Sequence, residues 1–338
     1  MDDVAARAGV SRALVSLVMR DSPKVSDASR AKVLAAAADL GYRPNLMARN
    51  LASRRTMTVG VLLDDLHNPF YAEVADGLLD AAFEHGYRLL FTAGLRRPPI
   101  QERAIETLLE LHTDGVVIVS PRLGRAQLER IAAAVPLVVA TAPVKTTAFD
   151  TVNNDETKGC AMVVDHLVGL GHVDIWHIDG GDGAGARARR QGYERAMAAR
   201  GLAARCKVFT GEFTEEGGYE ATSKVLAAGR IPTAIFAGND LIAAGTIDRL
   251  ADGGLEVPDD VSIIGYDNSA IAALRRVALT TVDQPRFAMG RLSFQCLLER
   301  IDKARTKAVH HVLPGELIVR RSTAGPRRDA RRARAATR

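Results

Sequence analysis

Two different patterns of hydrophobic and polar positions divide the 338-residue chain. Residues 1–57 predict short helices without a strand, whereas from Thr58 onward short apolar runs alternate with amphipathic stretches. The runs recur at intervals of roughly 20 to 30 residues, which is typical of a parallel sheet whose strands are joined by helices. About nine such units are more than one sheet accommodates, so we expect two doubly wound α/β lobes with a cleft between them.

The individual elements of this second part follow from the same pattern. Strands are expected at residues 59–63, 88–91, 116–119, 137–140, 175–178, 234–237 and 261–264. Helices are expected at residues 71–85, 100–111, 184–200, 215–228 and 240–252. Ligands of such sheets bind at the carboxyl ends of the strands, so the functional residues of this part should follow the predicted strands.

Capping residues predict three helices in the first part. Asp2 or Asp3 can cap a first helix that Gly9 ends. Ser11 can cap a second helix and Ser26 a third. Two short helices joined by a tight glycine turn form the helix-turn-helix pattern, whose second helix presents its N-terminal residues to the major groove of DNA. Similar helical hairpins occur in bundles, so the pattern alone is only moderately specific.

The distribution of charge favours the DNA-binding interpretation. Residues 1–58 carry a net charge of +5 and residues 326–338 another +5, while the remainder carries −5. A basic head on an acidic body indicates that the head contacts a polyanion. The expected organisation is a helix-turn-helix domain at 1–44, a connecting segment at 45–57, a two-lobed α/β body at 58–325, and a disordered Arg-rich tail at 326–338.

Composition excludes several other classes of protein. The longest apolar runs are five or six residues, too short to cross a bilayer, so no membrane association is expected. Acidic residues follow Met1 where a secretory signal has a basic start, so we expect a cytoplasmic protein. Cys160, Cys206 and Cys296 form no CxxC pair, which favours reduced thiols over a metal or redox site. No metal or cofactor is predicted.

Short motifs spread along the chain carry a family resemblance. They include Asp3-Val4-Ala5, Ala8-Gly9-Val10-Ser11, Leu40-Gly41-Tyr42-Arg43-Pro44-Asn45, Asn68-Pro69-Phe70-Tyr71, Asn239-Asp240 and Gly265-Tyr266-Asp267. In their order and spacing, the chain resembles the lactose-repressor (LacI/GalR) family. The resemblance implies a homodimeric transcription factor whose head reads a palindromic operator in double-stranded DNA. It also implies that residues 45–57 are a hinge helix and linker, and that residues 58–325 are an effector-binding and dimerisation domain built like a periplasmic sugar-binding protein.

The resemblance assigns DNA contacts within the second helix. Arg12 and Ala13 fall where the family reads base edges, and Ser11 and Ser16 fall where it contacts phosphates. Arg12 suits a bidentate contact to guanine, whereas Ala13 offers only a methyl group to thymine. The family usually has Thr-Val-Ser-Arg where residues 14–17 of this chain read Leu-Val-Ser-Leu. The operator sequence therefore does not transfer from relatives.

A second group of DNA contacts is implied for the hinge. Residues 45–53 are too few to form a stable helix alone in water. In the family this segment becomes helical when it pairs with its dimer mate in the minor groove. Asn45 and Arg49 belong to this segment, and Leu51 occupies the place of a leucine that wedges between base pairs and kinks the DNA.

Candidate effector-binding residues of the body follow predicted strands or open helices. In the family, aromatic residues near the first strand and after a later strand stack on the ligand. An arginine, an asparagine and an aspartate bind its hydroxyl or carboxylate groups. An aromatic wall beside such charged groups suits a polyhydroxyl ligand, so the expected effector is a sugar or sugar derivative. The candidates are Phe70, Tyr71, Asp155, Arg189, Phe213, Asn239 and Asp267.

A nucleotide- or sugar-processing enzyme with a DNA-binding head is the alternative. Residues 180–185 are glycine-rich between a predicted strand and helix, the setting of a phosphate loop. They depart from GxGxxG and lack the Lys and Ser/Thr of a P-loop, so we interpret them as a flexible cleft loop. There is no Gly-x-Ser-x-Gly elbow, and His310-His311 fits a strand edge better than a metal site. We therefore predict a transcriptional repressor that is controlled by a small effector and has no enzymatic activity.

Overall fold

The computed structural model describes residues 1–19, 22–42 and 55–326. The chain divides between Thr56 and Met57 into two compact units, a head and a body. The predicted hinge contacts Asn45, Arg49 and Leu51 lie outside the described residues, as does the tail beyond Pro326. Within the described ranges, every helix is too short or too polar to cross a membrane.

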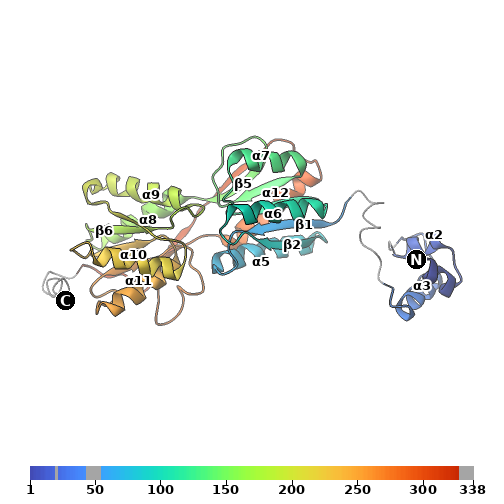
Figure 1. Ribbon diagram of the computed structural model, residues 1–338, viewed down its shortest axis with the longest axis horizontal. Coiled ribbons are helices and arrows are strands. Elements are labelled where there is room, and N and C mark those ends of the chain that lie inside the picture. Colours follow the sequence, from blue (N-terminus) through green and yellow to red (C-terminus); the bar gives the residue numbers. More distant parts are fainter. Residues whose placement is uncertain (20–21, 43–54, 327–338) are drawn as a thin grey trace. The chain divides into compact units, whose positions relative to one another are not determined.

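The head is a bundle of three short helices around a small apolar core. Val4, Val15 and Val33, one from each helix, are completely buried at its centre. Gly9 adopts a left-handed conformation with φ of 62°, which ends the first helix and turns the chain into the second. This confirms the predicted helix-turn-helix. The helices are α1 (Asp2–Ala8), α2 (Arg12–Met19) and α3 (Asp27–Asp39) (Figure 1).

Two of the three predicted helix caps are present. The Ser11 hydroxyl accepts a hydrogen bond from the Leu14 amide at 3.2 Å, and the Ser26 hydroxyl accepts one from the Ser29 amide at 3.4 Å. The capping role predicted for Asp2 or Asp3 is wrong. Helix α1 begins one residue earlier than expected, with Met1 as its N-cap, so both aspartates lie inside the first turn. Their charge there still favours the helix dipole.

Two parallel sheets form the body, as the alternation of apolar runs predicts (Figure 1). The first sheet has the order β11-β5-β4-β3-β1-β2, and the second has the order β7-β6-β8-β9. Every pairing within these two sheets is parallel. The first comprises β1 (Thr58–Leu63), β2 (Arg88–Ala93), β3 (Gly115–Val119), β4 (Leu137–Ala140), β5 (Asp150–Asn154) and β11 (His310–Leu313). The second comprises β6 (Ile175–Asp179), β7 (Val208–Thr210), β8 (Ala234–Ala237) and β9 (Ser262–Ile264), and β10 (Thr281–Asp283) pairs antiparallel with β12 (Glu316–Ile318) beside it.

Helices cover both faces of each sheet, and each layer encloses its own apolar core. On the first sheet, α5 (Pro69–Glu84) and α12 (Arg286–Ile301) pack on one face, and α6 (Pro98–Glu110) and α7 (Arg125–Ala134) on the other. On the second sheet the two pairs are α8 (Glu156–Gly169) with α9 (Ala186–Ala199), and α10 (Glu215–Leu226) with α11 (Asp240–Asp252); a short 3-10 turn spans Ala203–Arg205. The predicted pair of doubly wound α/β lobes is confirmed. All predicted strands and helices of the body are present, with ends that differ by no more than two residues.

Strand β5 was not predicted because its residues are polar. It is nevertheless completely buried, and Asp150 at its start has no exposed area. Its carboxylate pairs with Arg300 at 3.1 Å and with Arg305 at 2.7 Å. Those partners are about 150 residues away in sequence, so pattern alone does not show that the charge is compensated. Strand β11 places His310 at the edge of the first sheet, as expected for a strand edge.

Close contact between α5 and α12 supports the first lobe and depends on two glycines. A Cβ atom on Gly77 would lie 2.1 Å from the Phe287 carbonyl oxygen, and one on Gly290 would lie 2.2 Å from the Val74 carbonyl oxygen. Backbone atoms cannot move aside as a flexible side chain would. The two helices therefore approach each other only where both positions lack a side chain.

Gly77→Ala should lower the free energy of unfolding by about 1–3 kcal/mol, because the new methyl group forces the helices apart. Gly169→Ala is the matched control: nothing lies within 4 Å of its Cβ position in α8, and alanine there should raise the stability by up to about 1 kcal/mol. Urea unfolding measures both. Equal stability of the two variants would contradict the proposed close approach.

Candidate functional site

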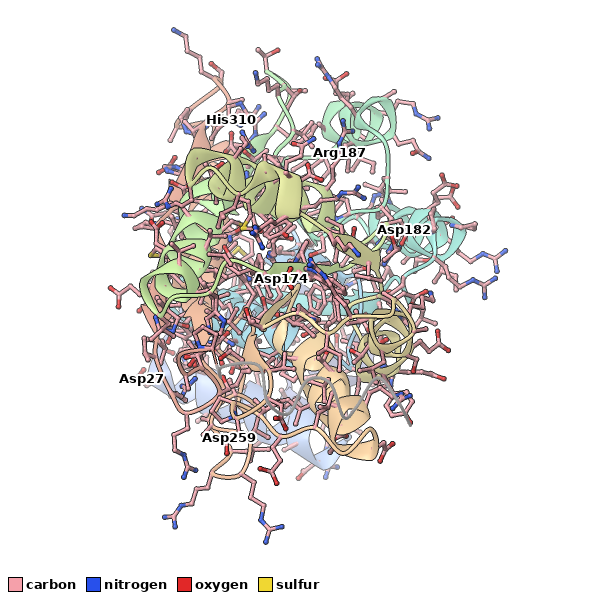
Figure 2. The ribbon with its side chains drawn as sticks, turned by 90° about the vertical axis from the view of Figure 1, so that its left-hand side faces the viewer. Asp27, Asp174, Asp182, Arg187, Asp259 and His310 are labelled. Carbon is pink, nitrogen blue, oxygen red and sulfur yellow. The ribbon has the colours of Figure 1, made fainter. Side chains whose placement is uncertain are left out.

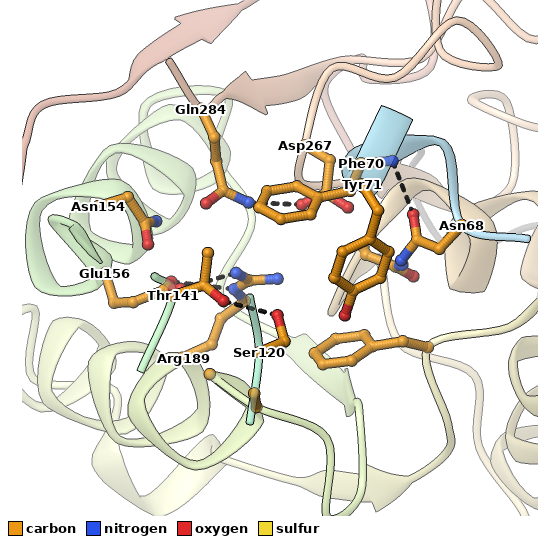
Figure 3. A pocket seen from close by; sticks show the side chains of 14 residues that line it. Asn68, Phe70, Tyr71, Ser120, Thr141, Asn154, Glu156, Arg189, Asp267 and Gln284 are labelled. Atoms are coloured by element: carbon orange, nitrogen blue, oxygen red, sulfur yellow. Dashed lines mark hydrogen bonds and ion pairs between the residues drawn. The ribbon is translucent and has the colours of Figure 1, made fainter. Parts of the chain in front are cut away.

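A pocket opens at the carboxyl ends of the strands of both lobes (Figure 3). It is lined by Asn68, Phe70, Tyr71, Ser120, Thr141, Asn154, Glu156, Ala184, Gly185, Arg189, Phe213, Asn239, Asp267 and Gln284. Six of the seven predicted effector residues are in this set.

Aromatic side chains line part of the pocket. Phe70 and Tyr71 lie in the first turn of α5 with their rings edge to face and their centroids 5.4 Å apart. The Asn68 side chain caps this turn by accepting a hydrogen bond from the Phe70 amide at 3.0 Å. The third ring, Phe213, lies against the glycine-rich loop, where a Cβ atom on Gly180 would be 2.2 Å from it. The glycines thus make room for an aromatic ring.

Arg189 is the main cation among the lining residues, and its side chain is nearly all buried. Its Nη2 donates to Glu156 Oε1 at 2.7 Å, its Nε donates to Glu156 Oε2 at 3.0 Å, and its Nη1 donates to the Gly238 carbonyl oxygen. The guanidinium carbon also lies 3.8 Å from the centroid of the Tyr266 ring. Burial opposes the charge on Arg189, but Glu156 outweighs it, and the pKa of the guanidinium is raised.

Asp267 is the second buried charged group that was predicted. Its Oδ1 accepts a hydrogen bond from Gln284 Nε2 at 2.5 Å, and its backbone has a φ of 113°. Burial raises the pKa of Asp267 to about 7, and the nearby Asp240 carboxylate adds to the shift. A carboxyl group with this pKa can donate or accept a hydrogen bond near neutral pH, which suits a ligand hydroxyl.

The structure changes the position expected of one candidate. Asp155 does not line the pocket, because its carboxylate caps α8 by accepting a hydrogen bond from the Lys158 amide at 2.9 Å. The next residue, Glu156, lines the pocket instead. Asn239 does line it, although its Oδ1 also caps α11 through the Ile242 amide at 2.9 Å.

Sequence reasoning missed several lining residues that share one signal. Ser120 directly follows β3 and Thr141 directly follows β4, and both adopt positive φ angles, 58° and 63°. Their hydroxyl groups are 2.6 Å apart. A polar residue immediately after a buried strand would have identified both. The other missed polar residues are Asn68, Asn154, Glu156 and Gln284.

Two arginines of the first lobe connect it to the second lobe beside the same strand ends. Arg122 pairs with Asp64 at 3.1 Å in its own lobe and with Asp182 at 2.7 Å in the other. Arg96 pairs with Glu212 across the lobes at 2.8 Å. The Asp182 side chain, labelled in Figure 2, is 89% exposed, and ion pairs with exposed partners contribute only about 0–1 kcal/mol each. Each of these two ion pairs therefore contributes little to the contact between the lobes.

The predicted DNA contacts of the head lie at the start of α2. The Arg12 side chain is 70% exposed, with its Nε 3.6 Å from Asp2 Oδ1. Ala13 is also exposed, and Ser11 is exposed while it caps the helix. Ser16, one turn further on, is partly buried. The end of α2 nearest the glycine turn therefore presents one long cationic side chain to its surroundings.

Comparison with known proteins decides the family. Residues 1–45 match the model of "Bacterial regulatory proteins, lacI family", and residues 164–323 match "Periplasmic binding protein-like domain". The chain is 35% identical over 331 residues to the HTH-type transcriptional repressor PurR of Vibrio campbellii, which covers 94% of this chain and 96% of the relative. The chain belongs to the lacI family of bacterial regulatory proteins. It is a DNA-binding transcriptional regulator.

Solved structures of lacI-family proteins share the fold. A crystal structure of the lac repressor dimer bound to operator and the anti-inducer ONPF is similar with a TM-score of 0.86, at 28% identity, over 95% of this chain and 98% of that chain. A complex of the transcriptional regulator CelR with cellobiose is similar with a TM-score of 0.72, at 33% identity, over the same shares of the two chains. These likenesses extend over head and body alike.

The lining residues of this lacI-family protein include no histidine, cysteine or lysine. Across the described ranges, no three His, Cys, Asp or Glu residues are grouped so that they could hold a metal ion. The pocket is therefore equipped with hydroxyl, amide, carboxyl and guanidinium groups between aromatic rings. Such a set of groups is well suited to bind a polar molecule with several hydroxyl groups.

The raised pKa of Asp267 predicts a pH dependence of stability without ligand. An aspartate with an ordinary pKa of 3.8 and a folded-state pKa of about 7 stabilises the fold fully below pH 3.8 and loses that contribution as the pH rises through about 7. Asp267→Asn removes the titration. The melting temperature of the parent, taken relative to that of the variant, should therefore fall between pH 5 and pH 8.

The control for this measurement is Asp182→Asn, which removes an exposed carboxylate from the same lobe. The parent and the control should show the same dependence on pH. A parent and an Asp267→Asn variant with parallel melting temperatures at all pH values would show that Asp267 titrates normally.

Proposed function

We propose that this protein is a homodimeric repressor whose operator affinity is controlled by a small carbohydrate. The observation that supports this most is the presence, in one chain, of a helix-turn-helix with an exposed Arg12 and a polar pocket with aromatic walls. We further propose domains at 1–44, 45–57, 58–325 and 326–338, as expected from the sequence. Because its target is chromosomal DNA, the protein acts in the cytoplasm.

In the proposed DNA complex, α2 enters the major groove. Arg12 forms a bidentate contact with guanine, while Ala13 meets a thymine methyl group. Ser11 and Ser16 contact phosphates, which fix the register of the helix on the duplex. The two hinges of the dimer enter the minor groove, with contacts from Asn45 and Arg49 and a wedge from Leu51.

Exposed apolar side chains on the first lobe support a homodimer. Phe83 and Leu79 lie one turn apart on α5, with exposed fractions of 87% and 47%. Leu90 and Phe91 on the edge strand β2, against which α5 packs, are also exposed. Exposed apolar side chains on a helix and on the edge strand beside it suit a protein interface, and a second copy offers the same surface around a two-fold axis.

Effector control follows from the position of the pocket. A ligand that contacts both lobes favours the closed arrangement and so shifts the population of conformations. If the closed body changes how the two copies meet, it also changes whether the paired hinges can stay on DNA. The effector in this proposal is bound by Phe70, Tyr71, Arg189, Phe213, Asn239 and Asp267, with Asp155 supporting the site as the cap of α8. No substrate is turned over.

The proposal is tested by sequencing DNA fragments that the purified protein retains, with and without D-ribose, D-glucose or cellobiose. We expect a palindromic consensus whose retention changes with one of these neutral sugars, and a sugar recovered unchanged. Fragments without a common sequence would contradict the regulator. Chemical conversion of the sugar would support the enzyme instead.

Arg12→Ala should weaken binding to the selected operator by about 1–3 kcal/mol and relax the preference at one base position. The matched control is Arg7→Ala, which removes an exposed arginine of the same head that pairs with Asp39 at 3.3 Å. It should leave the consensus unchanged. Fluorescence anisotropy with operator variants measures both. An unaltered base preference in the Arg12 variant would rule out its role as a base reader.

A further inference from the structure

The start of α9 has the properties of an anion-binding site. This helix has Gly185 as its N-cap, and no side chain caps it. The first amides of a helix lack partners within the helix and carry a partial positive charge, so helix N-termini attract phosphate and carboxylate groups. One turn into the same helix, the buried guanidinium of Arg189 adds a full positive charge.

A carboxylate of the chain itself lies at this place. Glu156, in the first turn of α8, pairs with Arg189 through both oxygens, at 2.7 and 3.0 Å (Figure 3). Its Oε1 is also only 3.4 Å from where a Cβ atom on Gly185 would lie. Glu156 therefore lies beside both the guanidinium of Arg189 and the start of α9. These are the two groups that an anionic ligand would bind.

No other lining residue supplies a positive charge in place of the one that Glu156 neutralises on Arg189. Among the fourteen described lining residues, the ionisable acids and bases other than Tyr71 are Glu156, Arg189 and Asp267. With Glu156 paired to Arg189, the pocket is neutral when Asp267 is protonated and negative when it is ionised. A second anion placed beside Glu156 would meet a like charge in a partly dry site, where repulsion is strong.

We infer that Glu156 is a built-in anion that makes this pocket select uncharged polyhydroxyl ligands and reject sugar phosphates and uronates. The inference rests on the proposed carbohydrate-binding function and narrows its ligand class. Discrimination against a phosphorylated sugar relative to its neutral parent should be on the order of 100-fold or more in affinity. Removal of the Glu156 charge should open the helix start and Arg189 to a phosphate.

The test compares the full-length parent with Glu156→Gln and with Glu194→Gln. The control residue pairs with Arg190 at 3.1 Å on the outer face of α9, so its loss removes a similar ion pair outside the pocket. Calorimetry and thermal shift are run with D-ribose and D-ribose 5-phosphate, with D-glucose and D-glucose 6-phosphate, and with inorganic phosphate alone. Glu156→Asp, which keeps the charge, is included to separate charge from shape.

We expect the parent and Glu194→Gln to bind a neutral sugar, to bind its phosphate at least about 100-fold more weakly, and to show no stabilisation by inorganic phosphate. Glu156→Gln should gain stabilisation by inorganic phosphate and lose most of the discrimination, and Glu156→Asp should keep it. A parent that binds a sugar phosphate as tightly as the neutral sugar would overturn the inference, as would a folded Glu156→Gln variant without phosphate binding. If Glu156→Gln does not fold, discrimination by the parent alone decides.

The same experiment separates this inference from the proposed function. If the parent binds neither kind of sugar while Glu156→Gln binds inorganic phosphate, the carbohydrate effector is contradicted and the role of Glu156 stands. If the parent binds only sugar phosphates, the carbohydrate effector stands and the inference about Glu156 fails.

Discussion

The constraint on which the body depends is the parallel pairing of its strands. Each parallel connection must return through a helix, so the carboxyl end of every strand opens into a loop at the same edge of its sheet. The chain passes between the lobes three times, after β5, after β10 and after β11. These crossings bring the two loop-bearing edges together. Residues as distant as Asn68 and Gln284 therefore line one pocket.

Helix α5 runs from this pocket to the exposed apolar side chains of the first lobe. Its first turn carries Phe70 and Tyr71, and its last turn carries Phe83. Near its start, Glu73 pairs at 3.0 Å with Arg286, which begins α12 directly after the crossing strand β10. This helix of 16 residues thus has one end at the pocket and the other at the proposed dimer surface. Small movements of the lobes can reach the partner copy through it.

A structural feature could be predicted from the sequence when the residues that stabilise it are close together in the chain. Apolar runs and caps such as Ser11 depend on near neighbours, so the helix-turn-helix and the doubly wound lobes were predictable. Strand β5 and the pair of Glu156 with Arg189 depend on partners brought by other elements. The sequence predicted Asp155 as the carboxylate of the pocket. In the structure Asp155 caps α8, and the next residue, Glu156, lines the pocket. A spacing argument cannot distinguish two adjacent acids with such different roles.

In the proposed function, ligand binding in the pocket and DNA binding by the head are coupled. The most direct test measures the affinity of the parent for its neutral sugar twice, free in solution and in complex with the selected operator. If the two sites are coupled, bound operator changes the affinity of the protein for the sugar by a certain factor. The sugar must then change the affinity for the operator by the same factor, typically about 5- to 150-fold. We predict matching factors within this range. Identical sugar affinities with and without operator would contradict this coupling, because the pocket would then exert no control over DNA binding.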